Sequence, residues 1–384
     1  MGIFLLGCGE MGCVTGTDLL ETYEGELTFA DLEIGRAKTL AERYPKRKVR
    51  LVSVNVKDHK NLVKAIRDSG ASIVINAVNY YFNLDVMLAC LEAHANYIDL
   101  GGLFHTTLKQ LELDKVFRGQ DLLAIPGCGS SPGIMNVLAA FGARKFDKVT
   151  DIYVSFADKD YTKYNTPIVL PYSIQTLFDE FGEKPAVLRN GKIEFVEPLS
   201  GAEKITFPDP LNGASCFYTL HSEIATLPRS FGLKNCSFRG GFDLGLVSKV
   251  RFLLDAGFAS DEQVKLADGQ SVSPKKFVVR LMDRFVPALD IKINDLEFLR
   301  VELLGKSKGK KKKLVVYCES FTNKKWNIPA GSWNTGVAPS IIAQMIERGD
   351  VKHAGVVPPE IALNSEILFK ELGKRDMKVW IARK

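Results

Sequence analysis

The chain has 384 residues, with 51 Lys and Arg against 45 Asp and Glu, which gives a formal net charge of +6. Hydrophobic residues make up 46% and charged residues 25%, which excludes a disordered, collagen-like or disulfide-rich chain. No apolar run approaches the roughly 18–20 residues that a membrane span needs, so we expect a soluble protein without a membrane partner. The length predicts two domains with a cleft between them.

Strands and helices alternate along the first 125 or so residues. We expect strands at residues 3–6, 27–30, 49–56, 73–77, 97–99 and 122–125. We expect helices at residues 11–23, 34–44, 62–69, 84–94 and 108–118. These strands are apolar throughout, as a parallel sheet covered by helices on both faces requires. The pattern predicts an α/β fold, a Rossmann-type doubly wound parallel sheet.

A second pattern follows a helix expected at residues 134–144. Alternating strands such as 149–156, with Pro and Gly turns and a helix at 274–284, predict a mixed, mainly antiparallel α+β substrate domain. Helices at 338–347 and 360–374 and a strand at 379–381 end the sequence, and we expect this tail to pack on the first domain. The predicted division is therefore 1–126 with 331–384 for the dinucleotide-binding domain and 127–330 for substrate binding and dimerisation.

The positive charge has a single source. Residues 305–313, between expected strands at 301–304 and 314–317, hold six lysines and no acid, so removing them leaves 6 − 6 = 0. We interpret Lys306–Lys313 as a solvated hairpin tip, because it has no aromatic residue on which a base could stack. We expect no nucleic-acid partner.

The cysteines indicate the compartment. They are odd in number, scattered and without a C-x-x-C pair, which favours a reducing, cytoplasmic location and argues against a metal site. They are Cys8, Cys13, Cys90, Cys128, Cys216, Cys236 and Cys318.

A glycine motif directly follows the first expected strand. In Gly7-Cys-Gly-Glu-Met-Gly12, Gly7 permits a tight turn, Gly9 lets backbone amides approach a pyrophosphate, and Gly12 lets helix and strand pack closely. Glu10 and Met11 open the helix at the same site. The spacing predicts a dinucleotide site; a methyltransferase, which also has glycines after its first strand, is the alternative.

Asp31 ends the second expected strand and predicts which cofactor binds. A carboxylate there accepts hydrogen bonds from both ribose hydroxyls and repels a 2′-phosphate, which favours NAD over NADP. Arg36, nearby in the next helix, moderates this preference if it reaches the ribose, so NADP stays open.

Ligands of an open α/β sheet bind outside the carboxyl ends of its strands. Three segments meet this condition: 76–83, which starts with Asn76, Ala77 and Val78, then 99–102, and 126–133. We expect the first to contact the cofactor.

Together these blocks resemble the saccharopine dehydrogenase-like oxidoreductases along essentially the whole chain. The resemblance rests on the glycine motif, V-I-N-A-V-N-Y-Y-F-N, Y-I-D-L-G-G, P-G-C-G-S-S-P-G, L-H-S-E-I-A-T-L, Arg239-Gly240, and T-G-V-A-P-S-I-I-A from Thr335. It implies a split Rossmann domain, a central substrate domain, a C-terminal segment that returns to the cofactor domain, and a homodimer.

The resemblance also implies roles for individual residues. Tyr80, Asp99 and Cys128 would line the site near the nicotinamide, with Tyr81 competing for the position of Tyr80, and Thr335 would contact the cofactor. Arg239 would hold a substrate carboxylate, and His221 and Glu223 would face the cleft. The family often has an Asp at the position of Ser131.

The hypothesis for function is hydride transfer between NAD(P) and a CH–NH bond of a small amino acid. A base must first deprotonate the ammonium, and Asp99 and His221 are the candidates, with Glu223 orienting the amine. L-lysine, oxidised at its ε-carbon, is the favoured substrate. Saccharopine, which would demand a further cationic clamp from Arg229, Lys163 or Arg251, and carboxynorspermidine are the alternatives. A catalytically inactive NAD-binding regulatory protein is the alternative of another class.

Overall fold

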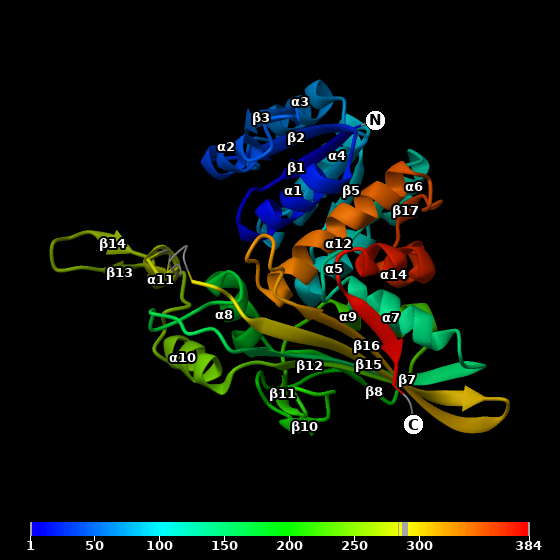
Figure 1. Cartoon of the computed structure of the whole chain (residues 1–384). Coiled ribbons are helices and arrows are strands. Elements are labelled where there is room, and N and C mark those ends of the chain that lie inside the picture. The colour runs from blue at the N-terminus through cyan, green and yellow to red at the C-terminus, as the bar shows by residue number, and fades with distance from the viewer. Residues whose placement is uncertain (1, 283, 286–290, 383–384) are drawn as a thin grey trace.

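A seven-stranded sheet forms the centre of the first domain in the computed structural model, which describes residues 2–282, 284–285 and 291–382 (Figure 1). All neighbouring strands in it are parallel, which confirms the predicted doubly wound sheet. In spatial order the strands are β17 (Gly355–Val356), β6 (Leu123–Ile125), β5 (Asn96–Asp99), β4 (Ile73–Asn76), β1 (Gly2–Leu6), β2 (Glu26–Asp31) and β3 (Val49–Ser53).

Both faces of this sheet are buried, which explains why its strands are apolar throughout. On β1, Ile3 and Leu5 enter one hydrophobic core, whereas Phe4 and Leu6 enter another. The helices of this domain are α1 (Glu10–Thr22), α2 (Gly35–Glu42), α3 (His59–Ser69), the short η1 (Tyr80–Phe82), α4 (Asn83–Ala93), α5 (Leu103–Leu111) and α6 (Asp114–Gly119).

A nine-stranded sheet forms the second domain. Only the pairing of β7 with β12 is parallel, so the predicted mixed, mainly antiparallel domain is confirmed. The strands are β7 (Lys148–Asp160), β8 (Ala186–Arg189), β9 (Lys192–Phe195), β10 (Glu203–Ile205), β11 (Ala214–Tyr218), β12 (Asn235–Gly241), β15 (Asp295–Ser307), β16 (Lys310–Phe321) and β18 (Lys378–Ile381).

Helices and a small ribbon surround this second sheet. The ribbon pairs β13 (Val264–Lys265) with β14 (Ser271–Val272). The helices are α7 (Ile134–Ala143), α8 (Ile174–Gly182), α9 (Glu223–Phe231), α10 (Leu244–Asp255), α11 (Pro274–Met282), α12 (Ala330–Glu347), α13 (Pro359–Ala362) and α14 (Ser365–Gly373). The helix predicted at 274–284 is confirmed as far as Met282, and residue 283 lies outside the described residues.

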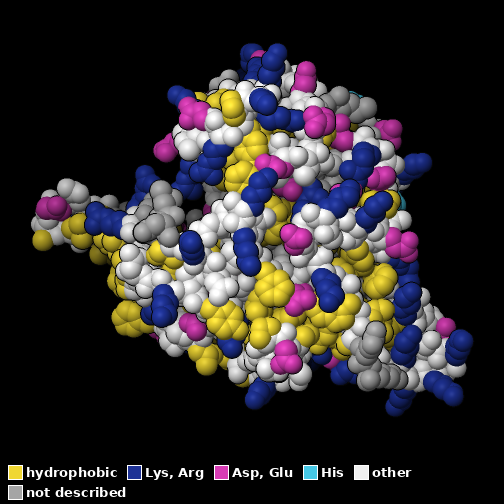
Figure 2. All heavy atoms as spheres, viewed as in Figure 1, with side chains coloured by type: hydrophobic (Ala, Val, Ile, Leu, Met, Phe, Trp, Pro, Cys, Tyr) yellow, Lys and Arg dark blue, Asp and Glu magenta, His cyan; other side chains and the backbone are white. Residues whose placement is uncertain are grey.

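The lysine-rich segment is the tip of the hairpin formed by β15 and β16. The chain reverses at Lys308 and Gly309, both with positive φ, and the basic side chains gather on this projecting tip (Figures 1 and 2). Lys313 pairs with Glu302 at 2.8 Å. The predicted strands on either side of the tip are confirmed.

The C-terminal segment, which we expected to pack on the first domain, contributes strands to both sheets. Helix α12 lies against α1, so closely that a Cβ on Gly336 would come within 2.4 Å of Val14 Cβ. The hydroxyl of Thr15 donates to the carbonyl oxygen of Gly336 at 2.7 Å. Strand β17 extends the first sheet, but β18 pairs with β16 in the second.

Three predicted helices have different bounds. The helix expected at 108–118 is two helices, α5 and α6, and α12 begins at Ala330 instead of residue 338. The helix expected at 360–374 is interrupted where Leu363 and Asn364 are extended. The side chain of Asn364 accepts hydrogen bonds from the amides of Glu366 and Ile367, so it caps a new helix at this point.

Candidate active site

The glycine turn has the geometry of a dinucleotide cradle. Gly7 has φ +94°, and a Cβ there would lie 2.7 Å from the backbone of Ala77 and Val78. A Cβ on Gly12 would lie 1.9 Å from the carbonyl oxygen of Gly7, so only glycine allows α1 to approach β1 so closely. A Cβ on Gly9 would meet nothing within 4 Å. The turn is therefore open where a pyrophosphate would approach the start of α1.

A cavity of about 1220 Å³ runs from this turn to the second sheet. At the cofactor end it is lined by Gly9, Glu10 and Met11 after β1, by Ala77, Val78 and Tyr80 after β4, and by Thr335 of α12. Strands β1 and β4 are neighbours, and the chain order reverses between them, which is where doubly wound sheets bind nucleotides. Six of the ten expected cofactor residues therefore line one end of a single cleft, and they fit a dinucleotide.

Two of the expected cofactor residues, Asp31 and Asn76, lie outside the cleft lining and bind the backbone that forms this end of the cleft. The carboxylate of Asp31 accepts hydrogen bonds from the amide of Cys8 at 2.5 Å and from that of Glu33 at 3.0 Å, so it fastens the glycine turn to the end of β2. Asn76 is buried and accepts a hydrogen bond from the amide of Val78 at 3.3 Å. Recognition of a ribose by Asp31 stays a prediction.

His221 faces the cleft from the segment before α9. Its Nδ1 lies 2.7 Å from Oε2 of Glu223, and its ring stacks on Phe238 with centroids 3.7 Å apart. Burial opposes a charge on the imidazole, but Glu223 and Glu180 outweigh burial and raise the pKa of His221. Burial likewise acts against the Glu223 carboxylate, but His221 lowers its pKa, with further hydrogen bonding from Ser131. The pair fits a charged imidazole beside a carboxylate.

Tyr80 joins the two domains. Its hydroxyl donates to Oδ2 of Asp179 on α8 at 2.8 Å, and the hydroxyl of Tyr81 donates to the same oxygen. Lys275 of α11 approaches the other oxygen of Asp179 at 3.7 Å. The two tyrosines that compete for one position in the sequence therefore share one partner, and only Tyr80 also lines the cleft.

Asp99 and Cys128 do not line the cleft, which corrects the expectation that they face the nicotinamide. Asp99 is 1% exposed, and its carboxylate accepts from the amides of Gly101 and Gly127, both at 2.8 Å, and from the side chains of Asn83, Tyr97 and Gln110. It fastens two loops together.

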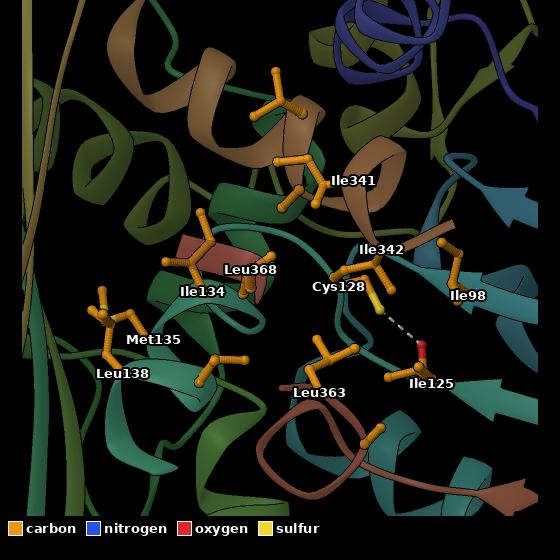
Figure 3. Close-up of a cluster of buried hydrophobic side chains, with 14 of the residues drawn as sticks. Ile98, Ile125, Cys128, Ile134, Met135, Leu138, Ile341, Ile342, Leu363 and Leu368 are labelled. Carbon is orange, nitrogen blue, oxygen red and sulfur yellow. Dashed lines mark hydrogen bonds between the residues drawn. The ribbon is translucent and has the colours of Figure 1, made fainter. Parts of the chain in front are cut away.

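The Cys128 thiol is packed among apolar side chains and points at the carbonyl oxygen of Ile125, 3.3 Å away (Figure 3). Burial raises the pKa of this thiol, so it is a packing residue rather than an ionised nucleophile.

Arg239 does not line the cleft either, contrary to the expectation that it holds the substrate carboxylate. Its guanidinium stacks on Tyr218 at 4.1 Å and donates to the Tyr218 hydroxyl and to the carbonyl oxygen of Gly201, with Glu203 3.3 Å away. The proposed second clamps, Arg229, Lys163 and Arg251, also lie outside the cleft lining. Of the described residues, no arginine lines the cleft.

Carboxylates dominate the charged lining of the cleft. Seven acidic side chains line it against two lysines, in addition to His221. The acids are Glu10, Asp158, Asp160, Glu180, Asp243, Asp295 and Glu297; the lysines are Lys159 and Lys249. Sequence reasoning missed this set, apart from Glu10. A signal was present in β15, where Asp295 and Glu297 alternate with the apolar residues of a buried strand.

Two acids of the cleft lining, Glu297 and Asp158, hold their protons unusually strongly. Burial, with the neighbouring charges of Asp158 and Asp295, raises the pKa of Glu297 to about 8 against a hydrogen bond from Asn334. Burial together with Asp295, Asp160 and Asp243 raises the pKa of Asp158 to about 7. Like charges held close together in a crowded site favour a bound cation.

Residues 3–124 match the family model of the saccharopine dehydrogenase NADP binding domain, and residues 129–377 match that of the saccharopine dehydrogenase C-terminal domain. The chain belongs to the saccharopine dehydrogenase family. It is therefore an oxidoreductase whose first domain binds NAD(P), and the methyltransferase alternative is rejected.

Two curated proteins are similar to this chain over nearly its full length. Carboxyaminopropylagmatine dehydrogenase from Synechocystis sp. is 23% identical, over 92% of this chain and 91% of its own. Carboxynorspermidine synthase from Vibrio cholerae is 23% identical, over 99% of this chain and 100% of its own.

Solved structures share the fold. Saccharopine dehydrogenase (L-Glu forming) from Saccharomyces cerevisiae matches with a TM-score of 0.74 and 14% identity, over 100% of both chains. Homospermidine synthase from Legionella pneumophila, in complex with NAD, matches with a TM-score of 0.69 and 14% identity, over 100% of this chain and 91% of its own.

Within the described part of the chain, no helix is both long and apolar enough to cross a membrane. Among the same residues, no group of three or more His, Cys, Asp or Glu side chains has the arrangement of a metal site.

Proposed function

We propose that this chain is an NAD(P)-dependent oxidoreductase that forms or cleaves the secondary C–N bond of a carboxylated polyamine, a substrate class that includes carboxynorspermidine and carboxyaminopropylagmatine. The observation that carries the proposal is the acidic lining of the cleft, seven acidic side chains against two lysines, of which those with raised pKa values ionise when a cation binds beside them. A polyamine arm carries several ammonium groups, and closely spaced carboxylates are their natural partners. The names of the two relatives, carboxyaminopropylagmatine dehydrogenase and carboxynorspermidine synthase, agree with this chemistry.

The other candidate substrates are less well matched. Saccharopine joins two amino-acid ends and would bring additional carboxylates into an already acidic cleft, where no arginine of the described residues is available to bind them. L-lysine, which the sequence favoured, carries one ammonium beyond its reacting centre and α-carboxylate, so it would leave most of the cleft carboxylates unpaired. Both remain the comparison substrates for the test.

The chemistry is hydride transfer coupled to proton transfer. When bound, NAD(P)H supplies the hydride that reduces a C=N bond formed between an aldehyde and an amine. As the carbon gains hydride, the electron pair of the C=N bond moves to nitrogen, which needs a proton. His221 lines the cleft and Glu223 holds its Nδ1, so Nε2 is the nitrogen that we assign to donate this proton in reduction and accept it in oxidation.

The cofactor preference, the location and the assembly also belong to the proposal. Asp31 at the end of β2 supports NAD over NADP, although the matched family model is that of an NADP binding domain. Binding titrations of the two cofactors with the wild type and Asp31→Ala test this preference: the variant should lose affinity for NAD and gain it for NADP. The cytoplasmic location and the homodimer stay predictions.

The decisive experiment measures reduction of NAD and NADP at alkaline pH with carboxynorspermidine, carboxyaminopropylagmatine, saccharopine and L-lysine. We expect kcat/KM for one of the carboxylated polyamines to exceed that for saccharopine and lysine by about 100-fold, which corresponds to 2.7 kcal/mol or one well-placed ion pair. A faster reaction with saccharopine or lysine would reject the polyamine assignment. No reaction with any of the four would favour the inactive, regulatory alternative.

A further inference from the structure

His221 lies between two carboxylates on opposite sides of its ring. Glu223 Oε2 is 2.7 Å from Nδ1, whereas Glu180 Oε1 is 3.9 Å from Nε2. A separation of 3.9 Å is too long for a hydrogen bond, so it must shorten by about 1 Å before a proton can pass, as catalytic contacts do when substrate binds. The two carboxylates differ in access: Glu180 lines the cleft together with His221, and Glu223 is fully buried behind them.

The position of Glu180 is fixed by the fold. It projects from α8 and is 5% exposed, and the Tyr172 hydroxyl donates to its Oε2, which leaves Oε1 directed at the imidazole. The amide of Leu220, next to His221, donates to the backbone carbonyl oxygen of Glu180 at 3.3 Å. This contact joins α8 to the His221 segment.

We propose that Glu180 is a second acid–base group of this site, which exchanges a proton with His221 on the side of the ring that faces the substrate nitrogen. The proposal rests on the proposed function, because it assigns a role within that reaction. In reduction, His221 gives its Nε2 proton to the substrate nitrogen, the Glu180 carboxylic acid returns a proton to Nε2, and cleft water returns one to Glu180. In oxidation the same protons move in the opposite order, so the protons balance.

The charges around the pair are consistent with this exchange. Burial raises the pKa of Glu180 to about 7, partly offset by His221 and Tyr172, while Glu223 and Asp179 raise it further. The pKa of His221 is also raised. The groups that face the pair are Glu223 from α9, Asp179 from α8 and Tyr172 from the segment before α8, and the uncharged ring of Phe238 covers the imidazole from β12. Glu180 therefore changes protonation near neutral pH, beside an imidazole whose protonated form is favoured by the same neighbours.

A purely structural role for Glu180 makes a different prediction. If Glu180 served only to accept from the Tyr172 hydroxyl, Glu180→Gln would have little effect because its amide oxygen can still accept, whereas Tyr172→Phe would remove the hydrogen bond and have the larger effect. If Glu180 exchanges protons with His221, only Glu180→Gln removes the carboxylate from the Nε2 side. Tyr172→Phe is therefore the matched control.

The experiment combines nuclear magnetic resonance with kinetics. The pKa of His221 is measured in labelled protein, its signal being identified by its loss in His221→Asn. In Glu180→Gln we expect this pKa to fall by about 1 unit, because a neighbouring negative charge is removed, and kcat to fall about 100-fold with KM changed less than about threefold. In Tyr172→Phe we expect the His221 pKa to stay within a few tenths of the wild-type value.

Each outcome bears on the pair independently of the proposed substrate. An unchanged His221 pKa in a folded Glu180→Gln variant would overturn the proposal, and so would an equal loss of kcat in Tyr172→Phe. Activity of the wild type in the same assay reports separately on the proposed function. If the wild type oxidises none of the four amines, that function fails, while the resonance measurement still decides whether Glu180 and His221 are coupled.

Discussion

The hydroxyl of Tyr80 and the Oδ2 atom of Asp179 lie 2.8 Å apart, although one residue follows a strand of the first sheet and the other belongs to a helix of the second domain. Tyr81 donates to the same oxygen, and Lys275 approaches the other. This contact connects the segment beside the cofactor cradle to the wall that carries Glu180. The relative position of the two domains is therefore linked to Glu180 through α8, which carries both Asp179 and Glu180.

Removing both tyrosine hydroxyls should loosen this connection. We expect Tyr80→Phe and Tyr81→Phe each to raise KM about two- to fivefold, and the double variant to raise it more than tenfold, because one shared acceptor loses both donors. Steady-state kinetics with the preferred substrate measure the effect. Tyr161→Phe, at an exposed position just after β7, is the control. An unchanged KM in the double variant would show that this contact does not contribute to substrate binding.

The two cradle glycines should respond differently to alanine. Gly12→Ala should lower Tm by several degrees, because the new Cβ would overlap the carbonyl oxygen of Gly7. Gly9→Ala should leave Tm unchanged, since its Cβ meets nothing within 4 Å, yet weaken NAD(P) binding about tenfold by obstructing the open turn. Thermal unfolding and a cofactor titration on the same samples separate the two. Equal losses of affinity without a change in Tm would contradict this account.

Asp99→Asn tests whether Asp99 is a structural anchor. An amide accepts through one oxygen only, so buried donors of the two loops lose their partner, and we expect the free energy of unfolding to fall by about 2–3 kcal/mol. Chemical denaturation measures this loss, with the exposed Asp85→Asn as control. In contrast, His221→Asn should abolish most turnover. A stable Asp99→Asn protein without turnover would restore the catalytic role implied by the family resemblance.

The cleft carboxylates should make stability depend on pH. Glu297 titrates near 4.5 when unfolded and at about 8 in the folded protein, and Asp158 shifts from 3.8 to about 7. The folded state therefore holds more protons between these values, so the stability that these groups contribute is complete below about pH 4 and is lost as pH rises to about 8. We expect Tm to fall from pH 5 to pH 8, and Glu297→Gln to reduce the slope. A slope that Glu297→Gln leaves unchanged would contradict this assignment.

A polyamine should oppose this loss of stability. Because a bound cation favours the ionised carboxylates, norspermidine should raise Tm more at pH 8 than at pH 5, as mass action requires for a ligand of the folded state. Thermal unfolding at fixed ionic strength measures the difference, with potassium chloride at equal ionic strength as control. The same increase at both pH values would argue against binding at these acids.

The cofactor half of the site could be predicted from the sequence because it depends on local geometry. Gly7, Gly9 and Gly12 follow one strand directly, and Ala77 and Val78 follow its neighbour, so topology alone brings them together. The substrate half could not be predicted in the same way. Asp99 and Arg239 carry the expected functional groups, but whether a side chain faces a cleft or a loop interior depends on contacts between distant segments.

Glu180 and Asp158 line the cleft, but they could not be predicted from the sequence for the same reason. Both are ordinary acids in the sequence, one on a helix and one near the end of a strand, with no motif around them. Their importance arises only when α8, β7 and β15 bring their charges into one enclosed space. The buried acids of β15 were a usable signal, because a carboxylate inside an apolar strand is costly unless it has a purpose.

The C-terminal segment, which is shared between the two sheets, affects the order in which this protein can fold during synthesis. An N-terminal domain usually folds on the ribosome before the rest of the chain appears. Here α12 covers α1, β17 completes the edge of the first sheet, and β18 completes the edge of the second. The nucleotide-binding domain must therefore wait for segments synthesised long after its other strands. A nascent chain stopped at the lysine hairpin has every residue of the glycine turn, but not the helix that supports it.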